Sequence, residues 1–285
     1  MAERPNATVC KTVTPRVQIS LPTPNMINNI MFRFTDPWYI GYQILAHLSI
    51  IPMIMFATPN HWIIAISLGY LLGLIGSSVI YHKLLTHKSF IAPTWFIYIG
   101  SFFAALGGTG PAISWAAIHR AHHSRSDTEN DPHSPHIHST RRLFFQKLYL
   151  TGYFKTREEF TVWVPDLMKS KLQLFIFEYY IAINLIFILL IGLIFGWFGI
   201  VYIYFIPTIL RLHLTVVTTI VNHKWGYQPY DNKDYSTNNI WAWFLILGEA
   251  WHNNHHENPA NPNFGRKWFE FDPAYWIIKL VEKKG

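Results

Sequence analysis

Four long apolar runs alternate with polar stretches along this chain of 285 residues. In chain order they cover Tyr39–Ala57, Trp62–Tyr81, Gln173–Phe195 and Phe198–Val221. A helix of about 20 residues is about 30 Å long, which matches the hydrocarbon core of a bilayer. Only the short links Thr58–His61 and Gly196–Trp197 separate the members of each pair. The pattern therefore predicts two transmembrane helical hairpins, with an interruption at Pro52 and a kink at Pro207.

A fifth apolar stretch, Trp95–Leu106, is too short to span a bilayer, and we expect it to be interfacial or re-entrant. With four spans, 22 of the 23 Lys and Arg residues fall on one side. Positive charges mark the cytoplasmic side of a membrane protein. A fifth span would move nine of these charges outside, so the distribution favours four spans with the large polar segments in the cytoplasm.

The resulting fold class is an all-α integral membrane protein, in which four transmembrane helices carry a cytoplasmic helical cap. We expect five segments: an N-terminal cytoplasmic segment (1–38), hairpin 1 (39–81), a cap segment (82–172), hairpin 2 (173–222) and a C-terminal cap segment (223–285).

Composition supports this class and excludes several others. Half of the residues (51%) are hydrophobic and 14% are charged, so the chain is not intrinsically disordered. The single Cys excludes an intramolecular disulfide and a Cys-rich zinc site. The net charge is +7, but no long Lys/Arg run occurs, so the basic balance indicates membrane orientation rather than a nucleic-acid partner.

Fifteen His residues are the unusual feature, and many of them fall in three groups. The groups are an H-x4-H at 82–87 and two H-x-x-H-H sequences at 119–123 and 252–256. On a helix, positions i, i+3 and i+4 share a face, so each H-x-x-H-H is expected to present three imidazoles to one point. Positions i and i+5 lie about 140° apart, so His82 and His87 suit two different metal ions or a helix that ends between them.

With His223 at the end of the fourth run, nine histidines are expected at the cytoplasmic face. Nine nitrogen ligands exceed the need of one tetrahedral zinc and would serve two metals with four or five ligands each. Imidazole suits Zn, Cu, Fe and Ni, so spacing alone does not select iron.

The four sequences HKLLTH, HRAHHSRSDTENDPH, NHKWGYQPYD and GEAWHNNHH, together with the spans, resemble the membrane fatty-acyl desaturases. The resemblance extends from about residue 35 and is to the Δ9 stearoyl-CoA-desaturase-like branch; His252 stands where front-end desaturases usually have Gln. It implies four transmembrane helices under a cytoplasmic cap with two irons between them. The implied ligands are His82, His87, His119, His122, His123, His223, His252, His255 and His256.

Other residues beside the boxes are expected to support the site. Asp127, Asp131 and Glu249 are candidates to accept the second ring N–H of a ligand His and so fix its tautomer. In animal enzymes of the family, an Asn four residues before the fourth-span His reaches an iron through water. Thr219 stands at that position here, with Asn222 nearby.

By the same resemblance, Trp115 and Thr215 shape the bend of an acyl tunnel. Ordinary packing is the alternative for both residues. Arg211 and His213 lie inside the fourth run, where an ionisable side chain is costly and usually functional.

The implied reaction is the O2-dependent introduction of a cis double bond, at Δ9, into saturated C16–C18 acyl chains. The carrier is CoA, acyl carrier protein or a lipid. The sequence has no His–Pro–Gly–Gly haem motif, dinucleotide fingerprint or Cys cluster, so we expect an external electron donor: cytochrome b5 or a ferredoxin, with its reductase. The short terminal segments favour a bacterial inner membrane over the endoplasmic reticulum.

Two alternatives remain. A His-box di-iron hydroxylase or ketolase of the same superfamily would also abstract a hydrogen atom. A membrane metal transporter would place its ligands within the spans, whereas eight of the nine box histidines lie outside the apolar runs and the ninth, His82, directly follows one.

Overall fold

The fold is helical throughout the described part of the chain. The computed structural model describes residues 37–144, 153–154 and 156–283. Within these ranges there is no β-strand, and only isolated bridges join Asn238 to Tyr227 and to Trp251. The all-α expectation is thus confirmed for these residues; most of the N-terminal segment 1–38 lies outside them.

The first apolar hairpin is present and continues beyond the predicted boundary. It comprises α3 (Pro37–Leu48), α4 (Ile50–Phe56), α5 (Pro59–Leu71) and the π-helix η2 (Leu72–Thr86). The interruption expected at Pro52 occurs at Ser49, and Pro52 itself lies inside α4. This shift has a steric cause, because a proline ring clashes with the carbonyl four residues earlier, which here belongs to Leu48.

The second hairpin reverses direction at a glycine. It comprises α12 (Tyr180–Phe198), the π-helix η4 (Gly199–Phe205) and α13 (Ile206–Lys224), and the short α11 (Lys171–Glu178) precedes it. The run expected to be continuous from Gln173 is therefore divided at Tyr179. The reversal lies at Gly196, whose φ of 64° and ψ of −157° are accessible essentially to glycine alone. The predicted link at this position is confirmed.

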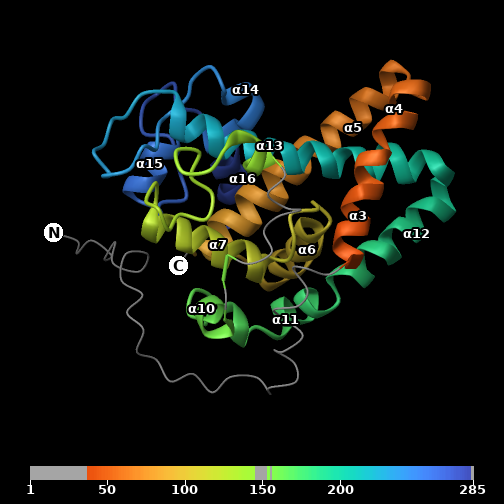
Figure 1. Ribbon diagram of the computed structural model, residues 1–285, viewed down its shortest axis with the longest axis horizontal. Helices are drawn as coiled ribbons and strands as arrows, with labels where there is room; N and C mark the ends of the chain where they lie inside the picture. The colour runs from red at the N-terminus through yellow and green to blue at the C-terminus, as the bar shows by residue number, and fades with distance from the viewer. Residues whose placement is uncertain (1–36, 145–152, 155, 284–285) are drawn as a thin grey trace.

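In the described part of the chain, two helices are long and apolar enough to cross a membrane. They are Pro59–Thr86 and Tyr180–Lys224, and the second is the one that turns back at Gly196. The helix α6 (Thr94–Ala105) has 12 residues and is about 18 Å long, as expected for a segment that does not span. In Figure 1 the ends of α4, α5 and α12 lie on one side of the molecule, and the C-terminal helices α14, α15 and α16 lie on the other.

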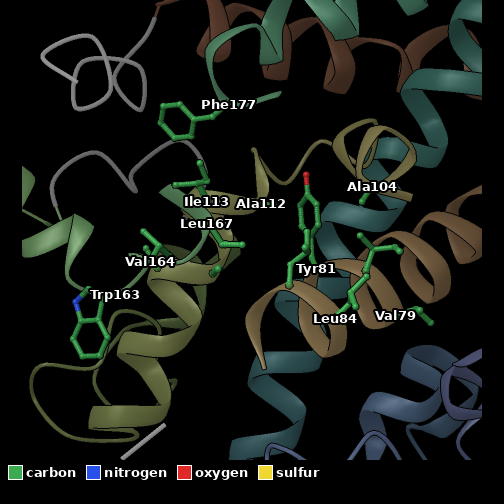
Figure 2. Packing of buried hydrophobic residues seen from close by; sticks show 14 of the residues in the cluster. Val79, Tyr81, Leu84, Ala104, Ala112, Ile113, Trp163, Val164, Leu167 and Phe177 are labelled. Atoms are coloured by element: carbon green, nitrogen blue, oxygen red, sulfur yellow. The ribbon is translucent and has the colours of Figure 1, made fainter. Parts of the chain in front are cut away.

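The main hydrophobic cluster joins η2, α6 and α7 (Ala112–Arg125) to the segment around Val164. Figure 2 shows Tyr81 and Leu84 of η2 on one side of this cluster and Ile113 of α7 on another. Glycine allows η2 and α6 to approach closely: a Cβ added at Gly76 would lie 3.1 Å from the Ala104 backbone. This packing sets the positions of the two helices that carry the first and second His boxes.

A buried ion pair ties the C-terminal segment to η2. The Lys83 ammonium lies 2.5 Å from Asp272 Oδ2 and also donates to the carbonyl of Pro262, and both charged side chains are fully buried. Asp272 in turn accepts the backbone N–H of Phe264, whose ring stacks on His255. The pair therefore helps hold the third His box against the first.

The remaining helices are short. They are α8 (Thr140–Phe144), α10 (Arg157–Thr161), η3 (Leu167–Lys169), α14 (Trp243–Ile246), η5 (Leu247–Ala250), α15 (His252–Glu257) and α16 (Pro273–Val281).

Candidate metal centre

The structure brings the nine predicted histidines together in two adjacent groups. The first, called group 1, is His82, His87, His119, His123 and His255; the second, group 2, is His122, His223, His252 and His256. Within each group, one ring nitrogen from every member lies within 4.8 Å of the others. Eight of the nine side chains are buried, and His123 is half-buried.

A π-helical turn explains why His82 and His87 belong to the same group. The backbone N–H of His87 donates to the carbonyl of His82 over 3.0 Å, which is an i to i+5 bond. In such a turn, residues five apart lie nearly above one another. Of the two alternatives that the spacing left open, the structure shows the second: η2 ends at Thr86, between the two histidines, and both rings enter group 1 with centroids 4.9 Å apart.

Each H-x-x-H-H box contributes to both groups, contrary to the expectation that three imidazoles would meet at one point. His119 and His123 of α7 enter group 1, whereas His122 enters group 2. In α15 the i, i+4 pair enters group 2 and the middle ring, His255, enters group 1. On a helix, i and i+4 are about 40° apart, and i+3 lies about 60° to the other side of i. In each box the middle histidine therefore joins the group that holds the outer two histidines of the other box.

The ring nitrogens of group 1 face one another at short range. The Nε2 atoms are 3.0 Å apart for His82 and His255, for His255 and His123, and for His123 and His119. Two nitrogens that each bind one ion at about 2.1 Å, at a right angle, are about 3.0 Å apart. The spacing thus fits a cation, which would remove the repulsion between facing lone pairs.

Four carboxylates hold the outward nitrogens of four histidines. Each Nδ1–H donates to a carboxylate oxygen at 2.8–2.9 Å; the pairs are His82 with Glu249, His122 with Asp131, His223 with Asp127 and His256 with Asp234. This fixes the tautomer that leaves a lone pair on Nε2. The Nε2 atoms of His122 and His223 are buried and have no hydrogen-bond partner among the described residues. An imidazole set with unused, buried lone pairs is chemically suited to a metal.

Asp127, Asp131 and Glu249 were expected beside the boxes, whereas Asp234 was not. Asp234 lies 22 residues before its partner His256, in a polar loop that also contains Asp231. No spacing rule connects a loop carboxylate to a ring so distant along the chain. Only the docking of the loop on α15 makes the contact.

Burial and hydrogen bonding together determine the charges of the site. Burial raises the pKa of Asp127, but hydrogen bonding and attraction from His223 outweigh this and lower the pKa to about 2. The pKa of Glu249 is likewise lowered to about 2, because attraction from His82 outweighs burial. Both carboxylates are therefore ionised at neutral pH.

Most of the rings are neutral. Burial, followed by repulsion from neighbouring rings, lowers the pKa values of five of them well below the usual range: His87, His119, His123, His252 and His255. Burial also lowers the pKa of His256, and Asp234 opposes this, with a result of about 4. Neutral imidazole is the form that binds metal ions.

A cavity of about 150 Å³ opens onto both groups. Its wall includes His82 and His119 of group 1 and His122, His223 and His252 of group 2. The walls come from η2, α7, α13 and the α14–η5 segment, and they are mostly apolar. The arrangement can therefore place an apolar chain next to both His groups.

The predicted tunnel residues both line this cavity. Trp115 stacks on His119, with ring centroids 4.7 Å apart and planes 18° apart. Thr215 also contributes to the wall, and its hydroxyl donates to the carbonyl of Arg211. Their positions suit a role in shaping a bound chain.

Thr219 and Asn222 form no hydrogen bond to a histidine ring among the described contacts. The Thr219 hydroxyl donates to the carbonyl of Thr215, as hydroxyls within helices commonly do, and the side chain lines the cavity. Asn222 donates to the backbone carbonyl of Glu249 over 2.8 Å and so supports the segment that carries the carboxylate.

Two histidines outside the groups serve the loop that follows the second box. The ring N–H of His136 donates to the carbonyl of His223, and that of His138 donates to the carbonyl of Asp131. His133 lines the cavity, and its ring lies 4.2 Å from that of His122. The loop is thereby fixed against the group 2 carboxylates.

Comparison with known proteins adds an independent observation. A sequence model described as fatty acid desaturase matches residues 59–284. The sn-2 palmitoyl-lipid 9-desaturase of Nostoc sp. (strain 36) is 30% identical over 251 residues, covering 88% of this chain and 82% of that protein. The sn-1 stearoyl-lipid 9-desaturase of Anabaena variabilis is 29% identical over 266 residues, 93% of both chains. The acyl-CoA C20 Delta5-desaturase of Anemone leveillei is 32% identical over 240 residues, 81% of this chain and 73% of that protein.

Proposed function

Because this chain belongs to the fatty acid desaturase family, we propose that it is an O2-dependent di-iron desaturase that introduces a cis double bond at Δ9 into saturated C16–C18 acyl chains. One observation carries this proposal: nine buried or half-buried histidines form groups of five and four beside a mostly apolar cavity. An oxidoreductase acting on fatty acyl chains follows from the family; the position of the double bond and the metal are the proposed parts.

The nine histidines would hold two irons, one in each group. When bound, the irons would supply the activation of O2 that removes two hydrogens from an unactivated CH2–CH2 unit. Such C–H bonds have no acidic proton, so a protein base alone is not sufficient. The four carboxylates, Asp127, Asp131, Asp234 and Glu249, would orient four of the rings and keep their Nε2 atoms unprotonated.

The cavity would position the acyl chain and keep water from the reacting carbons. Trp115 lines the cavity and stacks on His119, so its ring is well placed to set which methylene pair comes closest to group 1. Two of the relatives are named 9-desaturases, which favours Δ9, but a relative of similar identity is named a Delta5-desaturase. The carrier of the acyl chain is CoA, acyl carrier protein or a lipid. The Anabaena relative is named for a lipid-linked substrate, and the Anemone relative is named for an acyl-CoA.

We further propose a multi-pass topology in which both hairpins cross the membrane. The apolar side chains near the hairpin turns support it, since Ile54 is 72% exposed and Leu193 is 75% exposed. The His groups would then lie at the cytoplasmic face of a bacterial inner membrane. Electrons would come from cytochrome b5 or a ferredoxin with its reductase, attracted to the basic cytoplasmic segments.

Expression in a desaturase-deficient yeast tests the proposal. Mass spectrometry of the fatty acids, with the double bond located by chemical derivatisation, should reveal Δ9 cis-monoenes of 16 or 18 carbons. A Δ5 product would overturn the proposed position but not the desaturation. A hydroxylated or keto product without alkene would identify the alternative chemistry of a hydroxylase or ketolase.

A further inference from the structure

Arg211 is a buried cation in the cavity wall that the proposed reaction does not use. It lies on α13 inside a candidate membrane span, and it is 3% exposed. A Cβ added at Gly73 or Gly107 would lie 3.5 or 3.6 Å from the aliphatic stem of Arg211, and the side chain lines the cavity. A guanidinium at such a depth is costly unless an anion or hydrogen-bond acceptors compensate it.

Within the described residues, no acceptor or anion contacts this guanidinium directly. The guanidinium forms no hydrogen bond or ion pair with any of them, and its Nε is buried without an acceptor. Glu249 attracts it from a distance, but the two Glu249 oxygens already accept from Ser78 and His82. The guanidinium therefore keeps its hydrogen-bond donors for a group that enters the cavity.

The same face of α13 is polar along the cavity. Thr215, Thr218 and Thr219 follow Arg211 at i+4, i+7 and i+8, and all four residues line the cavity. Each threonine hydroxyl donates to the backbone carbonyl four residues earlier, so its oxygen remains an acceptor. A cavity that held only hydrocarbon would need neither these three threonines nor the charge of Arg211.

We propose that Arg211 forms an anion-binding subsite within the cavity, and that its ligand is the carboxylate of an unesterified long-chain fatty acid. Guanidinium and carboxylate match in a two-point hydrogen-bonded pair, which the low-dielectric surroundings strengthen. The apolar walls accept the chain, which then runs along α13 toward His223, twelve residues or about 18 Å away. The proposal relies on the proposed function only for the nature of the chain.

Equilibrium binding to the purified full-length protein in one fixed detergent tests this subsite. Radiolabelled dodecanoate is the probe, and dodecanol and methyl dodecanoate are competitors of equal chain length without charge. The wild-type protein should prefer dodecanoate to both, and Arg211→Gln should reduce this preference on the order of ten-fold or more. Arg211→Lys, which keeps the charge, should retain part of it.

The matched control is Arg142→Gln, which removes one positive charge from an exposed position on α8 and should leave the preference unchanged. Equal binding of acid and alcohol by the wild-type protein, or an equal loss in both glutamine variants, would overturn the subsite. Iron content and desaturation of an ordinary acyl substrate are measured in parallel. Absence of desaturation by the wild-type protein would argue against the proposed function, whereas absence of a carboxylate preference in the wild-type protein would argue against the subsite.

Discussion

Replacement of Asp234 by Asn tests whether a carboxylate far away in sequence controls a ring of group 2. Asp234 Oδ2 lies 2.8 Å from His256 Nδ1, and both side chains are nearly inaccessible to solvent. Its other oxygen, Oδ1, accepts from both the backbone N–H and the hydroxyl of Ser236. In Asp234→Asn the amide oxygen should remain with these two donors, so the amide NH2 faces His256.

The amide NH2 is a donor, and it would require His256 Nδ1 to become an acceptor. The ring proton would then move to Nε2, the nitrogen that faces His252 within group 2. Loss of a partner that orients a metal ligand costs about 10- to 100-fold in metal affinity, or about 1.4–2.7 kcal/mol. Since the substitution reverses the tautomer as well as removing a charge, we expect a value near the upper end.

The assay is iron affinity, measured by competition with a chelator, together with iron bound per chain. Asp234→Asn should lose iron from group 2 first. The iron bound per chain should therefore fall toward half of the wild-type value when free iron is low. Asp231→Asn is the matched control, because this exposed aspartate lies in the same loop and accepts only the backbone N–H of Lys233 among its described contacts. Equal iron affinity in the two variants would refute the argument.

Three further predictions concern the boxes and their supports. His122→Ala and His255→Ala each remove one imidazole, from group 2 and group 1 respectively, and should abolish activity while the protein stays in the membrane fraction; full activity in either would contradict the ligand assignment. Trp115→Leu should shift the chain length or the double-bond position, seen by fatty-acid analysis, with iron content retained; parallel loss of both would indicate a structural role. Lys83→Met leaves Asp272 as an uncompensated buried charge and should destabilise the fold by about 3–5 kcal/mol in denaturant unfolding, whereas an unchanged midpoint would show that the pair contributes little.

Local sequence pattern was sufficient to predict the helical hairpins and the histidines of the site. The apolar runs predicted two hairpins, since hydrophobicity and length are properties of the segment itself. The break at Gly196 and the short α6 also follow from local signals. Eight of the nine histidines were identifiable because they fall in three short boxes, and His223 because it follows the fourth apolar run; the boxes also carry the family resemblance.

What the sequence left undetermined depends on how distant segments dock. The π-helical turn that joins His82 to His87 in group 1 is an alternative to the α-helical spacing, and packing of η2 against α6 and α7 accompanies it. The exchange of middle histidines arises because α7 and α15 face each other, so each helix presents its i+3 ring to the other group.

The same reasoning applies to Asp234 and Arg211. From sequence, Asp234 is one of several loop carboxylates and Arg211 is a charge in an apolar run. The tertiary structure makes the first a partner of His256 and places the second in the cavity without an acceptor among the residues that the structure describes. Composition and periodicity thus determine which segments are buried and which side chains can bind metal. Only the packing of those segments decides which lone pairs and charges remain without partners.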